Sequence, residues 1–121
     1  GWDLLPTLCE LAGMNKLKGI DGVSFAPTLL GQLKKQEKRE YLYWEFHERG
    51  GKQAVRMGKW KGIRLNVRKN KDAPIELYDL SKDIGEEENL ADKHPDLVKK
   101  MAQAMADSHT TNPNFRFLPG E

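Results

Sequence analysis

Several features that would define a class of protein are scarce or absent in this sequence. There is one cysteine, Cys9, among 121 residues, which excludes an internal disulfide and a zinc site built from several cysteines. No apolar run approaches the roughly 20 residues of a membrane-spanning helix, so we expect no membrane partner. A surplus of one charge is also missing, because 20 Lys and Arg oppose 18 Asp and Glu. Overall charge therefore gives no reason to expect nucleic acid as a partner.

The composition is that of a globular domain with a charged surface. Hydrophobic residues make up 38% of the chain and charged residues 31%, and 121 residues is a common length for one domain. The chain opens on Gly1, Trp2 and Asp3, immediately before a helical pattern. Such a start is what we expect of a segment cut from inside a larger protein.

A first helix is predicted within "DLLPTLCELAGM", residues 3–14. Asp3 is placed to cap it, Pro6 lies in its first turn, and Gly13 lies just past its end. Cys9 falls beside the apolar positions and is interpreted as a structural thiol. The apolar residues recur at helical spacing and form one stripe: Leu4, Leu5, Leu8, Leu11 and Ala12. The stripe is wide for so short a helix, so we expect it to need a partner surface.

The next segment, up to residue 40, is mostly loop. Ser24 is placed to cap a short helical turn over residues 26–30, which Gly31 would end. Residues 34–40, "KKQEKRE", carry mixed charges and are interpreted as a solvated connector.

Four strands are predicted in the second part of the chain, over residues 41–47, 52–57, 60–67 and 75–80. Gly58 suits the first central position of a type II′ hairpin turn. With that turn, Met57 would face Trp60 and Ala54 would face Ile63. The short connections indicate a mostly antiparallel sheet.

A last helix is predicted to begin at Pro95, with Asp96 complementing its positive end. Its apolar stripe is Leu97, Val98, Met101, Ala102 and Met105. The predicted fold class is α+β: a four-stranded antiparallel sheet packed with a C-terminal helix, plus the N-terminal helix.

Metal sites receive little support from the sequence. Asp79, Ser81 and Asp83 have the spacing that begins a calcium loop, but Ile84 and Leu90 stand where that loop needs Gly and Glu. Turn and capping roles are the better interpretation of the three residues. The three histidines are scattered, without a second ligand at helical or hairpin spacing.

Basic side chains lie along the predicted strands, with aromatic side chains among them. The basic ones are Arg49, Lys52, Arg56, Lys59, Lys61, Arg64 and Arg68, and the aromatic ones are Tyr41, Tyr43, Trp44, Phe46 and Trp60. The rings could build the core, the patch could contact a small anionic ligand, or it could bind single-stranded nucleic acid. We favour the core, because a sheet with one helix needs most of its rings there.

Several stretches, in this order, resemble one family. They are "DLLPTLCELAGM", "DGVSFAPTLLG", "YLYWEF…QAVRMGKWKGIR" and "ELYDLSKDIGEEENLADKHPDL". Together, over residues 3–108, they resemble the C-terminal subdomain of type I sulfatases of the bacterial arylsulfatase and N-acetylgalactosamine-6-sulfatase-like branch. The resemblance implies that residues 1–40 are a junction from the end of the catalytic α/β domain and that residues 41–121 are the subdomain.

The resemblance also implies a chemistry, the hydrolysis of sulfate esters by a formylglycine nucleophile with calcium. Cys9 is followed by "ELAG", which is not the C/S-x-P/A-x-R motif that is converted to formylglycine. We therefore expect no catalytic and no metal residue in this chain. Calcium and formylglycine are expected in a catalytic domain outside it, and a periplasmic or secreted location follows from the resemblance.

Loops of this subdomain border the substrate cleft in the family. The matching loop is "FHERGGKQ", residues 46–53, so His47, Glu48 and Arg49 are candidate substrate-binding residues for sugar hydroxyls or an anionic group. An exposed hairpin loop without such a role is the alternative. Arg56 is expected in a buried ion pair.

Two hypotheses follow. The first is the C-terminal part of a sulfatase acting on aryl or sugar sulfates, inactive alone, with its own catalytic domain as partner and no nucleic acid. The second is a free-standing module that binds anionic polymers such as sulfated glycans or single-stranded nucleic acid. Under the first, the N-terminal stripe would pack on the catalytic domain, or in a dimer of the isolated fragment.

Overall fold

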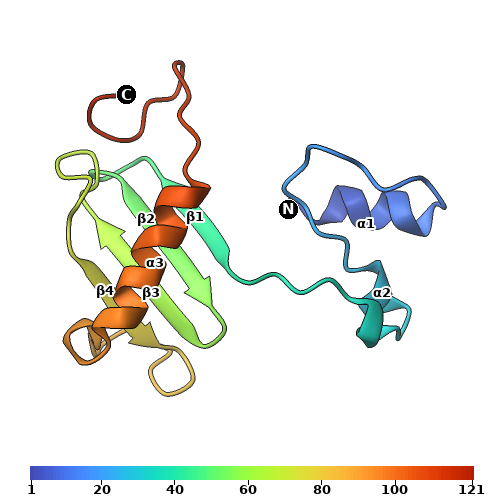
Figure 1. Cartoon of the computed structure of the whole chain (residues 1–121), viewed down its shortest axis with the longest axis horizontal. Coiled ribbons are helices and arrows are strands. Elements are labelled where there is room, and N and C mark those ends of the chain that lie inside the picture. The colour runs from blue at the N-terminus through green and yellow to red at the C-terminus, as the bar shows by residue number, and fades with distance from the viewer. The chain divides into compact units, whose positions relative to one another are not determined.

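The computed structural model describes all 121 residues, in two compact units that comprise residues Gly1–Arg39 and Glu40–Glu121. The first unit carries α1 (Leu4–Leu11), α2 (Ala26–Leu29) and a short 3₁₀ helix, Leu33–Lys35 (Figure 1). It buries very little: Pro6, Thr7 and Ala26. The apolar stripe of α1 stays uncovered, because its four leucines are between 47% and 57% exposed.

Polar side chains hold this first unit together. The hydroxyl of Thr7 donates to the carbonyl of Asp3 at 2.7 Å and accepts the N–H of Phe25 at 3.0 Å. Asp3 is the N-cap residue of α1, as predicted, but its side chain makes no capping bond. Its carboxylate instead accepts the N–H of Val23 at 2.8 Å and a guanidinium N–H of Arg39 at 2.6 Å. These two donors hold the carboxylate away from the N–H groups of α1. The bond from Val23 attaches the loop between α1 and α2 to the start of α1.

The second unit is a four-stranded antiparallel sheet with one helix on it. The strands are β1 (Leu42–Phe46), β2 (Lys52–Met57), β3 (Trp60–Leu65) and β4 (Ile75–Asp79), and they lie in the order β1-β2-β3-β4. A 3₁₀ helix, Ala91–Lys93, precedes α3 (Pro95–Ser108), which crosses one face of the sheet (Figure 1). The predicted α+β architecture is confirmed.

The turn between β2 and β3 also has its predicted register. Met57 pairs with Trp60 and Ala54 with Ile63. Gly58 has φ +58° and Lys59 has no positive φ, as a type II′ turn requires.

The core lies between the sheet and α3. It consists of Val55, Ile75, Leu77, Met101, Ala104 and Met105, and Tyr41, Tyr43 and Trp60 pack against it. Gly62 on β3 lies directly under α3, because a Cβ there would lie 2.5 Å from the sulfur of Met101.

The opposite face of the sheet, which we call the open face, carries no helix. Trp44 and Phe46 point there, 38% and 49% exposed, because alternate residues of a strand face opposite sides. The expectation that the rings are mostly core therefore fails for these two. The separate prediction of a buried ion pair for Arg56 is wrong: Arg56 is exposed on the same face and donates to the carbonyl of Gly58 at 3.1 Å.

The calcium-loop-like residues instead form a turn after β4. Asp79 accepts Lys59 Nζ at 2.6 Å and both the N–H and the hydroxyl of Ser81. Asp83 accepts the N–H groups of Glu87 and Glu88. These are the turn and capping roles predicted for them.

Asp79 leads to a prediction for the pH dependence of stability. The bonds from Lys59, then those from Ser81, hold the pKa of the Asp79 carboxyl at about 2. A carboxyl whose pKa is lowered by folding stabilises the fold above its unfolded pKa, and this stability is lost as the pH falls toward 2. We expect Asp79→Asn to flatten the fall in urea midpoint between pH 5 and pH 2. Asp92→Asn, at an exposed carboxylate, is the control, and an equal slope in all three proteins would contradict the expectation.

Candidate functional site

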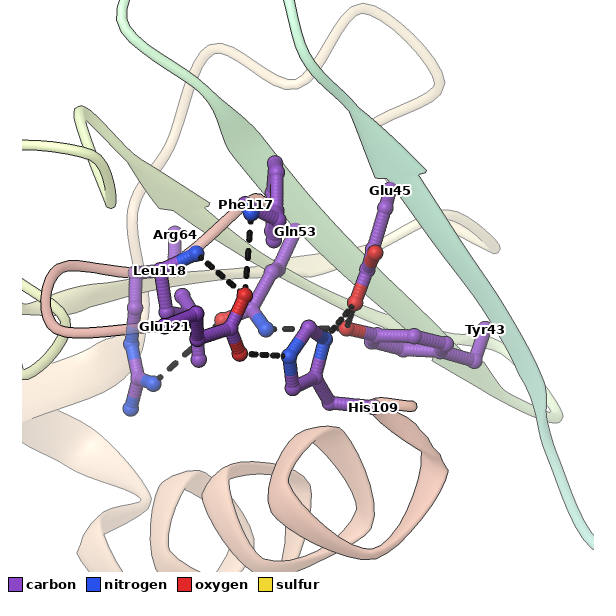
Figure 2. A network of polar contacts seen from close by, with 8 residues as sticks. All are labelled: Tyr43, Glu45, Gln53, Arg64, His109, Phe117, Leu118 and Glu121. Atoms are coloured by element: carbon purple, nitrogen blue, oxygen red, sulfur yellow. Dashed lines mark hydrogen bonds and ion pairs between the residues drawn. The ribbon is translucent and has the colours of Figure 1, made fainter. Parts of the chain in front are cut away.

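A network of polar side chains lies where α3 ends beside β1 (Figure 2). His109, directly after α3, is held between Glu45 of β1 and Glu121. Its Nδ1 lies 2.5 Å from an oxygen of Glu45, and its Nε2 forms a second, very close contact with Glu121. The same Glu45 oxygen accepts the hydroxyl of Tyr43, which in turn accepts Gln53 Nε2 at 2.8 Å.

The register of the sheet builds this network. Glu45 pairs with Gln53, and Gln53 pairs with Arg64, so three polar side chains form one row across β1, β2 and β3. The row lies on the face that α3 covers, because Tyr43 and Glu45 are two residues apart and share that face. Arg64 is the last side chain of the row, and it donates to the carbonyl of Lys71 at 3.0 Å.

Burial and charge shift the pKa values of these groups. Burial, followed by the hydrogen bond to Glu45, raises the pKa of the Tyr43 hydroxyl. Burial alone would lower the pKa of His109, but hydrogen bonds to Glu45 and Glu121 and their charges outweigh it and raise that pKa. The N–H groups of Phe117 and Leu118, followed by His109, hold the pKa of Glu121 at about 2. The raised pKa of His109 and the lowered pKa of Glu121 both favour the charged forms of this pair.

The C-terminal tail, residues 110–121, connects this network to the loop 46–53. Glu121 accepts the N–H groups of Phe117 and Leu118 at 2.9 and 3.1 Å, which closes the end of the tail on itself. The ring of Phe117 is 2% exposed and packs over Gly51, where a Cβ would lie 3.3 Å from that ring. His47 lies against the same ring, with 4.6 Å between the ring centres.

The three predicted substrate-binding residues lie in this loop but do not converge on one pocket. His47 is half-buried against Phe115 and Phe117, at centroid distances of 4.1 and 4.6 Å, and its Nε2 is buried without a hydrogen-bond partner. Glu48 and Arg49 are exposed, and Arg49 has a left-handed backbone with φ +52°. A substrate role for the three stays a prediction.

Sequence reasoning missed the His109 network. Glu45 was a visible signal, since it is the only acidic residue in a strand otherwise made of apolar and aromatic side chains. Its partners lie more than 60 residues further along: His109 directly follows α3, and Glu121 lies in a tail without periodicity. Only the packed structure brings them together.

The residues present do not fit the metal or the nucleophile of sulfatase chemistry. No group of three or more His, Cys, Asp or Glu side chains is arranged to hold a metal ion. Cys9 lies on α1 without the motif that formylglycine formation needs. No helix is long and apolar enough to cross a membrane.

A second candidate is a hollow of about 330 Å³ on the open face. It is lined by Trp44, Ala54, Arg56, Lys61 and Leu80. Lys61 is paired there with Glu86, so Arg56 is the cation without an acidic partner.

Known proteins share the sequence pattern and the fold of this chain. A sequence profile of the family described as N-sulphoglucosamine sulphohydrolase, C-terminal, matches residues 1–111. The chain is 37% identical over 112 residues to a Delta 4,5-hexuronate-2-O-sulfatase of Bacteroides thetaiotaomicron, covering 90% of this chain and 23% of that protein. It is 35% identical over 123 residues to arylsulfatase A of Bos taurus, covering 85% and 24%. The crystal structure of Ps i-CgsB matches with a TM-score of 0.73 and 25% identity over 97% of this chain and 26% of that one.

These relatives define a class, the sulfatases. The chain belongs to the type I sulfatase family, as a C-terminal subdomain of the N-sulphoglucosamine sulphohydrolase kind. The resemblance seen in the sequence is thereby confirmed, while the finer assignment to the N-acetylgalactosamine-6-sulfatase-like branch stays a prediction. The chain spans only 23% and 24% of the length of the two curated relatives.

Proposed function

We propose that this chain is the C-terminal part of a sulfatase that hydrolyses aryl or sugar sulfates, and that it supports a catalytic domain outside it. The observation that carries the proposal is the family match over residues 1–111, to relatives of which the chain spans about a quarter. Calcium and formylglycine would belong to that other domain. A periplasmic or secreted location is part of the same proposal.

Within such an enzyme, the loop 46–53 would border the substrate cleft. Glu48 and Arg49 are exposed and carry opposite charges, so they can meet sugar hydroxyls or a second anionic group. His47 would act differently, because its ring is held against the tail and fixes the base of the loop.

The proposal predicts that the 121-residue chain is inactive alone. With calcium and an aryl sulfate, we expect no turnover above buffer, because the formylglycine motif is not in this sequence and no cluster of side chains is arranged to hold the metal. The full-length protein, assayed in the same buffer, is the positive control. Turnover by the isolated chain, retained after further purification, would sink the proposal.

One observation favours a second function, a binding module for anionic polymers. The open face combines the exposed Trp44 and Phe46 with Arg56 beside a hollow, and rings with cations suit sulfated glycans or single-stranded nucleic acid. Heparin fragments and oligonucleotides titrated at two ionic strengths test it, because electrostatic binding weakens steeply with salt. Absence of binding at low salt removes this alternative.

A further inference from the structure

We propose that His109 is a positioning residue for the loop 46–53: by holding Glu45 and Glu121 together, it fixes the tail on the sheet, and the tail fixes the loop. We call the three side chains the His109 clamp. The inference rests on the proposed function only in its last step, the effect on substrate. The clamp itself is a property of the chain.

The first step is the anchoring of the tail. Residues 110–121 contain no helix or strand, and most of their side chains are exposed. Two attachments stand out: the buried ring of Phe117 and the contact of Glu121 with His109. Because Glu121 also accepts the N–H groups of Phe117 and Leu118, the contact with His109 holds the peptide that carries the Phe117 ring.

The second step is the contact of the tail with the loop. The Phe117 ring packs over Gly51 and beside the His47 ring. The ring of Phe115 also packs against the His47 ring. The far side of the loop is fixed by backbone bonds, from Val67 N–H to the carbonyl of Gly51 at 3.2 Å and from Arg68 N–H to that of Gly50 at 3.0 Å. The rings of the tail therefore decide where the His47 end of the loop lies.

The third step is the dependence on pH. The charged or titratable groups around His109 are Tyr43 and Glu45 on β1, Arg64 on β3 and Glu121 in the tail, with Gln53 on β2 as the neutral neighbour (Figure 2). The pKa of His109 is raised, so the clamp is charged and complete below the ordinary pKa of histidine. It loosens as the pH rises through the raised pKa. Glu121, with a pKa of about 2, stays ionised throughout that range.

The test follows the loop by NMR in the 121-residue chain. In the wild-type protein, we expect the amides of Gly51, Phe117 and Leu118 to titrate together with the His109 ring, and the cross-peaks between the His47 and Phe117 rings to weaken at alkaline pH. In His109→Gln, the titration should vanish and these cross-peaks should be weak at every pH. Glu121→Gln should behave in the same way as His109→Gln.

His94→Gln is the matched control, because it removes another histidine of the same unit and should leave the titration unchanged. Far-ultraviolet circular dichroism checks that each variant is folded. If His109→Gln folds and keeps the wild-type cross-peaks and titration, the clamp does not exist. If Gly51 titrates without Phe117 and Leu118, the tail is not the connection, and the inference fails as well.

A second measurement separates the clamp from the proposed function. In the full-length enzyme, His109→Gln should raise KM on the order of tenfold with kcat nearly unchanged, since a displaced loop weakens binding rather than chemistry. The KM of the wild-type enzyme should rise at alkaline pH, where the clamp loosens, and the KM of His109→Gln should lack this rise. If the clamp titrates in the wild-type protein but His109→Gln leaves KM unchanged, the substrate role of the loop is rejected. If the wild-type protein lacks the coupled titration, the clamp itself is rejected.

Discussion

Gly62→Ala is expected to destabilise the unit 40–121 by about 1–3 kcal/mol, the usual cost of overpacking a core. The new methyl group would lie 2.5 Å from the sulfur of Met101 and 3.3 Å from a methyl carbon of Ile75, so the packed side chain of Met101 must shift. Gly62 has no positive φ, so the alanine would meet no backbone strain there. Urea unfolding followed by circular dichroism measures it.

Gly85→Ala is the matched control, because Gly85 is exposed, has no positive φ and would make only ordinary contacts. Its effect should stay within about 0.5 kcal/mol.

Met101→Ala should cost about 2–5 kcal/mol by leaving a cavity. In the double variant, the methyl group added at Gly62 would fill part of that cavity, so the two separate costs should sum to more than the measured total. Strict additivity would mean that the two sites are not in contact.

Leu5→Asp combined with Leu8→Asp is the second change with a large expected effect, seen in the full-length protein. The two leucines are 57% and 55% exposed in this chain. If the stripe of α1 packs on the catalytic domain, each leucine contributes about 1.5–3 kcal/mol. The combined contribution of the two leucines is then comparable with the whole free energy of unfolding of a domain, commonly about 5–15 kcal/mol. We expect a severe loss of soluble yield and of sulfatase turnover.

The isolated chain provides the comparison. There the two substitutions should leave the circular dichroism of the sheet unchanged, and they should abolish any dimer detected by light scattering. Glu10→Lys, a charge change on α1 outside the stripe, is the control. A full-length double variant with wild-type yield and turnover would show that the stripe is not an interface.

The elements of the second unit could be predicted because local rules and packing agree there. Gly58 defines a tight turn, and that turn fixes the pairing of Met57 with Trp60. The spacing of Met101 and Met105 on α3 places both on the sheet. Asp3 occupies its predicted N-cap position, but the sequence could not show that its carboxylate bonds elsewhere, because the competing donors, Val23 and Arg39, lie 20 and 36 residues away.

The candidate site was only half accessible from the sequence. The loop 46–53 was identified by resemblance, and its position between β1 and β2 is as expected. The contacts that hold it were not, because Phe115 and Phe117 lie in a tail with no pattern. Trp44 and Phe46 show the same limit. Alternation along the strand predicts that both lie on one face of the sheet, but it does not predict which face the single helix covers.

By itself, the sequence determined the fold class, the hairpin register and the sulfatase family, since these depend on spacing, turn chemistry and motif order along the chain. Only the tertiary structure decided which face of the sheet is covered, where Arg56 points and which residues His109 joins. These outcomes depend on contacts between residues far apart in the chain. The free energy of such contacts is set by burial and by paired charges in three dimensions, which no local pattern records.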